Sequence, residues 1–487
     1  MSRLFPVLVC GAFVAALSLG ACAVPDVDRS IARAREATGT PKPLIQGAQG
    51  PLTGAQSQSL IAKVGAGGGD KILQRHLLIE EAVAGSPLTA DNKVTVLSDG
   101  AEAFKAIAEA LRAAKRTINL EYYIIEDVQL DADGAKLSDL LLQKRREGVA
   151  VNIIYDSFGS SATPGDFFDR LKQAGVNLLD FHPVTSLEAV RLNDRDHRKI
   201  LVVDGAVGIV GGVNLSKNYE SKLPGGSSGG SGSGEETEGT LPVEGLTNAI
   251  GLTTKLPDRW RDTAARIEGP AVAELQQLFV AQWESEKGPP LDRTDFFPRL
   301  SPKGDQVARI IGSSPEQSIS RYYVTLVSAL RNAETKAWIS AAYFVPTEEE
   351  MDALTDAARR GVDVRLLLPE VSDSNEAVEV AHSHYSDLLE AGVKIYETKN
   401  VVLHSKTVVI DGVWSAIGSS NFDHRSVLFN DEVDAVVLGA STAHALEQVF
   451  AEGVKTATPI DRERWEAGRP LTERVRGVFA RLWESLL

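Results

Sequence analysis

The stretch "HRKILVVDGAVGIVGGVN", residues 197–214, returns later in the chain as "HSKTVVIDGVWSAIGSSN", residues 404–421. In both copies a lysine follows the histidine by two positions, an aspartate follows it by seven, and an asparagine closes the stretch. The apolar residues on either side of each Asp-Gly pair predict two strands joined by a turn. Because the chain has only 8 histidines, two of them in the same frame indicate a duplicated unit.

The duplication extends well beyond these two stretches. "ALRAAKRTINLEYYII" (110–125) is matched by "ALRNAETKAWISAAYFV" (329–345), and "KRREGVAVNIIYD" (144–156) by "AARRGVDVRLLLP" (357–369). Segments with helical apolar spacing alternate with β-rich segments in the same order in both halves. We therefore predict an α/β protein made of two homologous domains.

The composition along the chain predicts the boundaries of these domains. We expect a signal peptide at 1–21, an N-terminal tether and lead-in at 22–92, a first domain at 93–290, a second domain at 291–465 and a C-terminal amphipathic helix at 466–487. The Gly- and Ser-rich run at 223–239 predicts a flexible insertion in the first domain. The apolar stripe of the last helix is consistent either with packing against the second domain or with binding to a lipid interface.

The N-terminus has the plan of a secretory signal, with Arg3 before an apolar run and small residues after it. The run ends in "LGAC" (19–22), which resembles the lipobox of bacterial lipoproteins. That resemblance implies that Cys22 is lipidated and that the protein is an exported lipoprotein anchored to a bacterial membrane. In a Gram-negative cell it would face the periplasm, and Ala23, in place of an aspartate, is compatible with the outer membrane.

The charge balance bears on the class of partner. The formal net charge is −15, whereas proteins that bind nucleic acid concentrate lysine and arginine on one surface. We therefore expect no nucleic-acid partner, and we expect an anionic substrate to be held by a local cluster of positive groups. The chain has two cysteines, Cys10 and Cys22. Because Cys10 would leave with the signal peptide and Cys22 would be lipidated, we expect no disulfide framework in the mature chain.

The two motifs and the residues that follow them are similar to those of a known family. With Gly211, Gly212 and Asn214 in one half and "GSSN" (418–421) in the other, they resemble the phospholipase D superfamily. "DHRKILVVDG" and "HRSVLFNDEVDA" are similar to the bacterial cardiolipin synthase branch. The resemblance covers residue 93 to the C-terminus and implies two α/β domains packed face to face around a single shared active site, without a metal or cofactor.

Phosphodiester chemistry explains why the motif is needed twice. Cleavage requires a nucleophile, an acid for the leaving group and positive charge around the phosphoryl oxygens. Residues i and i+2 of a strand face the same side, so His197 with Lys199, and His404 with Lys406, would meet at one phosphate. The resemblance implies a ping-pong reaction through a phosphohistidine, and we expect His197 to attack and His404 to act as the acid.

The remaining candidate site residues lie near the two motifs. We expect the phosphoryl oxygens to be bound by Lys199, Lys406, Asn214 and Asn421, with a hydroxyl from Ser419 or Ser420. A catalytic histidine also needs its second ring nitrogen fixed, and we predict that Glu432 orients His404 and Asp262 orients His197. Asp204 and Asp411 precede glycines at turns, so a catalytic role and a structural role are both compatible with their positions.

Three classes of function are compatible with these residues. The resemblance favours a phosphatidyltransferase that makes cardiolipin from phosphatidylglycerol, with phosphatidylethanolamine as a further candidate substrate. A phospholipase D that uses water as the acceptor would share the same site. A phosphodiesterase acting on nucleic acid is disfavoured by the net charge and by the presence of both motifs in one chain. We expect a monomer that contacts the membrane through Cys22 and, in the interfacial alternative, through the C-terminal helix.

Overall fold

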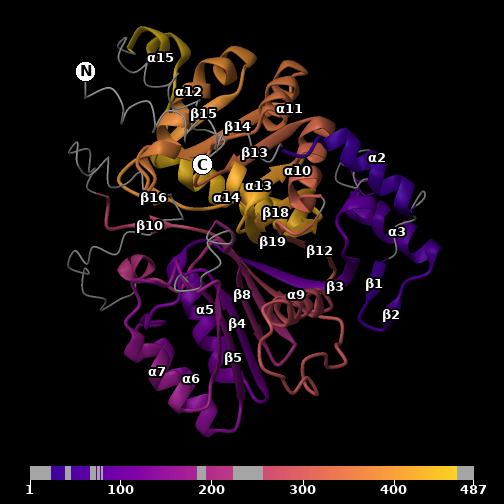
Figure 1. The fold of residues 1–487 in the computed structure, drawn as a ribbon. Helices are drawn as coiled ribbons and strands as arrows, with labels where there is room; N and C mark the ends of the chain where they lie inside the picture. Colours follow the sequence, from indigo (N-terminus) through magenta and orange to yellow (C-terminus); the bar gives the residue numbers. More distant parts are fainter. Residues whose placement is uncertain are drawn as a thin grey trace, which may run out of the picture.

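The computed structural model describes residues 24–38, 45–65, 73, 77, 80–183, 193–222, 256–317 and 319–468. Within these ranges two α/β units lie one above the other, the first in purple and the second in orange (Figure 1). The expected signal peptide with Cys22, the insertion at 223–239 and residues 469–487 of the expected C-terminal helix lie outside the described residues.

The first unit is a mixed sheet with the strand order β6-β5-β4-β8-β9-β11-β3. Its strands are β3 (Leu88–Leu97), β4 (Thr117–Tyr122), β5 (Ala150–Asp156), β6 (Asn177–Phe181), β8 (Lys199–Val203), β9 (Val207–Gly211) and β11 (Ala264–Glu268). Its helices are α5 (Gly100–Ala113), α6 (Leu137–Arg146), α7 (Gly165–Gln173) and α9 (Ala271–Ser285). β4, β5 and β6 run parallel because α6 and α7 carry the chain back between them.

The second unit repeats this plan with the order β15-β14-β13-β17-β18-β19-β12. Its strands are β12 (Gln306–Ser313), β13 (Lys336–Ser340), β14 (Asp363–Pro369), β15 (Lys394–Thr398), β17 (Thr407–Ile410), β18 (Trp414–Gly418) and β19 (Asn430–Leu438), with the short β20 (Thr458–Pro459) beside β15. Its helices are α10 (Arg321–Asn332), α11 (Glu348–Arg359), α12 (Asn375–Ala391) and α14 (Ala440–Thr456). The predicted duplication is confirmed element by element.

The two sheets pack against each other through one apolar core. Side chains from the central strands of both units meet in it, among them Ile200 and Val202 of β8, Val409 of β17, and Val433 and Val437 of β19. Residues of α9 and α14 also belong to this core, so these central strands are buried on the inner face by a helix as well as by the opposite unit. Buried strands of this kind favour branched apolar residues over an apolar-polar alternation. The expected face-to-face packing is confirmed, and it brings the ends of β8 and β17 close to the boundary.

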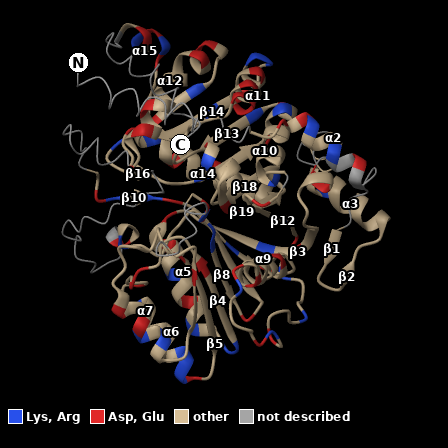
Figure 2. Ribbon diagram, viewed as in Figure 1, with Lys and Arg blue, Asp and Glu red and all other residues tan. Residues whose placement is uncertain are grey.

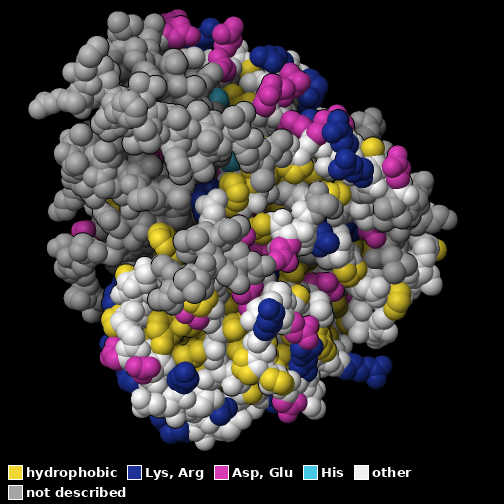
Figure 3. Space-filling model, viewed as in Figure 1, with side chains coloured by type: hydrophobic (Ala, Val, Ile, Leu, Met, Phe, Trp, Pro, Cys, Tyr) yellow, Lys and Arg dark blue, Asp and Glu magenta, His cyan; other side chains and the backbone are white. Residues whose placement is uncertain are grey.

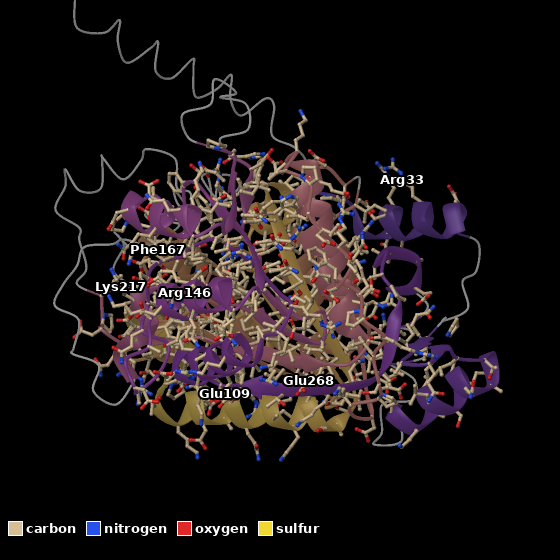
Figure 4. The ribbon with its side chains drawn as sticks, turned by 90° about the horizontal axis from the view of Figure 1, so that it is seen from below. Arg33, Glu109, Arg146, Phe167, Lys217 and Glu268 are labelled. Atoms are coloured by element: carbon tan, nitrogen blue, oxygen red, sulfur yellow. The ribbon has the colours of Figure 1, made fainter. Side chains whose placement is uncertain are left out.

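The N-terminal segment does not form the expected tether where the structure describes it. It contains α2 (Val27–Thr38), β1 (Ile45–Gly47), β2 (Gly50–Pro51) and α3 (Gly54–Gly65), of which α2 lies beside α10 in Figure 1. Val27 and Ile45 are buried in the core of the second unit, and β1 pairs with β3. Arg33, on the outer side of α2, points away from the body (Figure 4). Apolar residues spaced through this segment thus add a layer to the second unit.

The boundaries of the two units also differ from those predicted. β3 begins at Leu88, five residues before the expected start of the first domain, and pairs with β11 of the first unit and β12 of the second. Phe296, expected in the second domain, is buried with Phe279 and Trp283 of the first unit. The chain therefore passes to the second unit close to the start of β12.

Charged residues occur on both units. Acidic and basic residues are distributed over both in Figure 2, and residues of both signs lie on the coloured part of the face in Figure 3. Among the described residues, no helix has the length and apolar character required to cross a membrane.

Candidate active site

His197 lies at the boundary between the two units. It follows β7 (Arg195–Asp196), which pairs in parallel with the first residues of β19. The His197 amide continues this pairing by donating to the Asp431 carbonyl at 2.9 Å. The first motif of the chain is therefore held by backbone hydrogen bonds to the second unit.

His404 is held in the same way by the first unit. It follows β16 (Val402–Leu403), which pairs in parallel with β10 (Trp260–Arg261). Its amide donates to the Arg261 carbonyl at 2.8 Å. Both histidines are 1% exposed, so the tight packing of the boundary fixes their rings.

Each histidine contacts a carboxylate that comes from the opposite unit. Nδ1 of His197 is 2.9 Å from Oε2 and 3.0 Å from Oε1 of Glu432, and Nδ1 of His404 is 2.7 Å from Oδ2 of Asp262. Our predicted pairing, Glu432 with His404 and Asp262 with His197, is wrong. The two acids directly follow the short strand pairs β7–β19 and β10–β16, and these pairs cross the boundary between the units.

Both motif lysines lie beside their histidines, as the two-residue spacing predicts. Nζ of Lys199 donates to the carbonyl of His197 at 2.8 Å and lies 5.4 Å from the centre of the Tyr123 ring. Nζ of Lys406 lies 2.9 Å from Nδ1 and 3.0 Å from Nε2 of His404. Lys406 also donates to the carbonyl of His404 at 2.9 Å, so both lysines make the same backbone contact and Lys406 in addition lies directly at the ring of its histidine.

The asparagines and serines after the motifs are buried at the same boundary. The side-chain oxygen of Asn214 accepts from the backbone amide of Ile124 at 3.3 Å. The backbone amide of Asn421 donates to Oγ of Ser426 at 3.0 Å. The serines differ from our expectation of a phosphate contact. Ser419 donates to Glu432, and Ser420 donates to Asp434 at 2.5 Å. In this structure their hydroxyls support carboxylates.

Comparison with known proteins places this arrangement in a family. Residues 107–222 and 326–453 match the model of the family "Cardiolipin synthase, PLD-like domain". A cardiolipin synthase of Geobacillus kaustophilus is 34% identical over 421 residues, which are 85% of this chain and 76% of the relative. Cardiolipin synthase A of Pseudomonas syringae pv. syringae is 35% identical over 378 residues, 77% of this chain and 71% of that protein.

The chain belongs to the cardiolipin synthase branch of the phospholipase D superfamily. It is an enzyme of the phosphatidyltransferase class within that superfamily. A crystal structure of a phosphatidylserine synthase from Haemophilus influenzae has the same fold, with a TM-score of 0.59 and 13% identity over 86% of this chain and all of that one.

Asp204 and Asp411 have a structural place in this family member. Asp204 accepts from the amides of Lys115, Arg116 and Thr117 at 2.7–2.8 Å. Asp411 accepts in the same way from the amides of residues 334–336. Each has a φ of 51°, the left-handed turn conformation that aspartate tolerates. Both carboxylates tie a turn to the start of a neighbouring strand, so the structural alternative describes them and the catalytic one does not.

A buried charged cluster, which the sequence reasoning missed, lies behind the first motif. Arg198 donates to Glu121 at 3.2 Å, to Asp431 at 3.1 Å and to the carbonyl of Glu432 at 3.2 Å. Burial, partly offset by Arg198, raises the pKa of Glu121 to about 7. Burial and the charge of Glu121 also raise the pKa of Asp196 well above its usual range. In the sequence, the position between the histidine and the lysine of each motif differs: it is Arg198 in the first motif and Ser405 in the second. This arginine, next to a histidine in an apolar stretch, could have indicated that acidic partners are buried nearby.

Aromatic rings surround both histidines. The Tyr123 ring meets His197 edge-on at 5.4 Å, and Tyr343 meets His404 edge-on at 6.2 Å. Tyr219 and Trp260 also approach His404, at 6.5 and 5.5 Å. Tyr122, the residue before Tyr123, is buried in the core of the first unit.

The geometry supplies the parts that phosphoryl transfer requires. A carboxylate at Nδ1 fixes the ring and makes Nε2 the atom that can attack phosphorus or move a proton. The two lysines place positive charge beside the rings, where the charge on the phosphoryl oxygens must be stabilised. Among the described residues, no group of three or more His, Cys, Asp and Glu side chains is arranged to hold a metal ion.

Proposed function

We propose that the protein is a cardiolipin synthase that joins two molecules of phosphatidylglycerol and releases glycerol. The observation that carries this proposal is the pair of crossed contacts His197–Glu432 and His404–Asp262 at one boundary. Two imidazoles, each fixed by a carboxylate, match a reaction in which one ring attacks and the other moves protons. The lipid substrate is supported by relatives named cardiolipin synthases that share about a third of their residues with this chain over most of its length.

The reaction we propose has two displacements at one phosphorus atom. Nε2 of His197 attacks the phosphorus of the first phosphatidylglycerol, the bond to the glycerol headgroup breaks, and His404 protonates the departing oxygen. The glycerol hydroxyl of a second phosphatidylglycerol then attacks the phosphohistidine, and His404 takes up its proton. The bond between phosphorus and His197 breaks, cardiolipin leaves, and both rings return to their starting state.

The phosphoryl oxygens need positive charge in both steps. We assign that role to Lys199 and Lys406, whose backbone and ring contacts hold them beside the two histidines. We assign the side-chain amides of Asn214 and Asn421 to the same oxygens, because both asparagines follow the motifs at the boundary between the units.

The test is to identify the products made by purified protein from phosphatidylglycerol vesicles, with and without phosphatidylethanolamine. Cardiolipin formation supports the proposal, and ethanolamine release identifies phosphatidylethanolamine as a phosphatidyl donor. Phosphatidic acid as the sole lipid product would assign the protein to the hydrolytic phospholipases D. Neutral or alkaline quenching followed by peptide mass spectrometry should detect phosphatidyl-linked His197, and a label found only on His404 would reverse the two roles.

We also propose that the enzyme is a lipoprotein anchored through Cys22, in support of which the chain has "LGAC" after an apolar run. Val27, the first residue of α2, is buried in the second unit, so only four residues separate the proposed anchor from the folded body. Such an anchor would hold the enzyme against the bilayer that contains its substrate. Cys22→Ala should remove the lipid mass from the mature N-terminus and shift the protein from the membrane to the soluble fraction. An unmodified Cys22 in the wild-type protein would refute the anchor.

A further inference from the structure

A hydroxyl group follows each motif asparagine by five residues. Tyr219 stands five residues after Asn214, and Ser426 stands five residues after Asn421. Tyr219 lies in the 3₁₀-helix η3 (Lys217–Lys222), and Ser426 in the short helix α13 (His424–Leu428). The two residues thus occupy equivalent places in the duplicated unit, although one carries a phenol and the other an aliphatic hydroxyl.

Ser426 supports the carboxylate that holds His197. Its Oγ donates to Oε1 of Glu432 at 2.8 Å, and the side chain is 5% exposed. Glu432 also accepts from Ser419 and from the amide group of Asn430 at 3.3 Å. The charge of this carboxylate is therefore shared among three polar donors besides the imidazole itself.

Tyr219 supports the carboxylate that holds His404. Its hydroxyl donates to Oδ2 of Asp262 at 3.2 Å and lies 3.1 Å from Nδ1 of His404. The phenol ring is fixed by edge-on contacts with Trp260 at 5.9 Å and with Phe104 at 6.3 Å. Because the ring is buried, the hydroxyl is held at the carboxylate–imidazole contact.

We propose that Tyr219 and Ser426 are positioning residues that set the proton affinity of the two catalytic histidines separately, Tyr219 acting on His404 and Ser426 on His197. This inference rests on the proposed function only in assuming that both imidazoles act in the reaction. Each unit would then supply one histidine and, for the histidine of the other unit, a carboxylate with its hydroxyl. The exchange of phenol for serine at the equivalent place is one of the differences between the surroundings of the two rings.

The physical reason is the competition for each carboxylate. A hydrogen bond donated to a carboxylate stabilises its negative charge and weakens its attraction for the imidazole proton. Loss of the hydroxyl should therefore strengthen the hold of the paired imidazole on its proton. Lys406 also lies at the His404 ring, and its positive charge opposes protonation of the ring.

The surroundings of His197 are different. Lys199 is directed to the carbonyl of His197 and to the Tyr123 ring, and Arg198 binds the carbonyl of Glu432. The buried acids Glu121, Asp196 and Asp431 interact with Arg198. Glu432 contacts the His197 ring directly, and Ser426 acts on that carboxylate.

The test is the pH dependence of phosphatidylglycerol turnover by Tyr219→Phe, which keeps the ring and removes only the hydroxyl. One limb of the pH–rate profile should move upward by about half a pH unit, because the protonated form of His404 is favoured. A shift of the basic limb identifies His404 as the acid of the rate-limiting step. A shift of the acidic limb identifies it as the base or nucleophile in that step. Either shift supports the proposal.

Ser426→Ala should move the opposite limb, and Ser426→Thr, which restores a hydroxyl, should return that limb toward its wild-type position. Tyr385→Phe is the matched control, because Tyr385 is also buried and donates to a carboxylate, Glu397, at 2.9 Å in the second unit. It should lower thermal stability without moving either limb. If Tyr219→Phe behaves like this control, or if Tyr219→Phe and Ser426→Ala move the same limb, the proposal is wrong.

These outcomes are independent of the identity of the product. Phosphatidic acid in place of cardiolipin would overturn the proposed function, yet the limbs could still be measured and compared. Conversely, unshifted limbs in an enzyme that makes cardiolipin would overturn only the inference about Tyr219 and Ser426. Thermal melting of every variant separates the effect on proton affinity from unfolding. We expect the melting temperature of each variant to change by no more than that of Tyr385→Phe.

Discussion

Gly212 and Ser419 stand at the same place after the two motifs, and each is suited to the carboxylate beside it. A Cβ at position 212 would lie 2.3 Å from Oδ1 and 2.7 Å from Oδ2 of Asp262, closer than any side chain tolerates. At position 419 the side chain is accommodated, and its hydroxyl donates to Glu432. The difference between "GGVN" and "GSSN" is therefore a consequence of how each acid is packed.

Gly212→Ala should displace Asp262 and release His404 from its fixed orientation. A displacement of about 1 Å can cost roughly a hundredfold in rate, so we expect kcat to fall by about that factor with the fold retained. Steady-state kinetics on phosphatidylglycerol vesicles measures this change. Gly165→Ala is the control, because its Cβ would meet no atom within 4 Å. A Gly212→Ala enzyme with the kcat of this control would show that Asp262 does not orient His404.

At the scale of one element, α11 begins with a capping box that buries an acid. Oγ1 of Thr347 accepts from the Glu350 amide at 3.2 Å, and the Glu350 carboxylate accepts from the Thr347 amide at 2.9 Å. Burial, with smaller contributions from Asp423 and Glu349, raises the pKa of Glu350 from 4.5 to about 8. The hydrogen bonds that begin the helix therefore require the burial of a carboxyl group that is fully ionised in water at neutral pH.

Glu350→Gln should make the protein relatively more stable as the pH rises. The folded state of the wild type binds the Glu350 proton more tightly than the unfolded state, so its contribution is complete below pH 4.5 and is lost as the pH rises toward 8. Glutamine keeps the capping box and does not titrate. The difference in melting temperature, variant minus wild type, should increase between pH 5 and pH 8 and level off above about 8. A difference that is constant with pH would contradict the raised pKa.

At the scale of the whole molecule, both units contribute to each histidine–carboxylate contact of the proposed active site. Neither unit contains a complete histidine–carboxylate pair, because Glu432 serves His197 and Asp262 serves His404. Residues that act as one unit have strongly non-additive effects on rate. His197→Ala, His404→Ala and the double variant should therefore all lose nearly the same, and nearly all, of the turnover of the wild type. Substantial activity in either single variant, measured as cardiolipin formed per enzyme, would instead indicate two independent half-sites.

The N-terminal segment belongs to the folded body through a buried charged contact. Trp414 donates to Oε1 of Glu80 at 2.7 Å, and Oε2 of Glu80 lies 3.9 Å from the buried Arg309. Removing Glu80 would leave the buried N–H of Trp414 without this acceptor and would take away one of the carboxylates at Arg309, which also contacts Glu81, at a cost of about 3 kcal/mol. We expect Glu80→Ala to lower the free energy of unfolding by about that amount in urea melts. The control is Glu36→Ala, at an exposed position of α2, which should change the free energy of unfolding by less than about 0.5 kcal/mol. If Glu80→Ala and Glu36→Ala had equal effects, the N-terminal segment would behave as a tether.

The sequence by itself determined the duplicated α/β fold, the family and the two His–Lys pairs. These follow from local pattern: apolar periodicity predicts the strands and helices, a two-residue spacing places both side chains on one face of a strand, and the repeat indicates a shared site. Only the tertiary structure decided which acid serves which histidine. β7 and β10 pair with strands of the opposite unit, and no local pattern in "RDHRK" or "NDEVD" specifies that partner. The docking of α2 was decided in the same way, because whether an apolar residue such as Val27 is buried depends on a surface of the second unit far away in the chain.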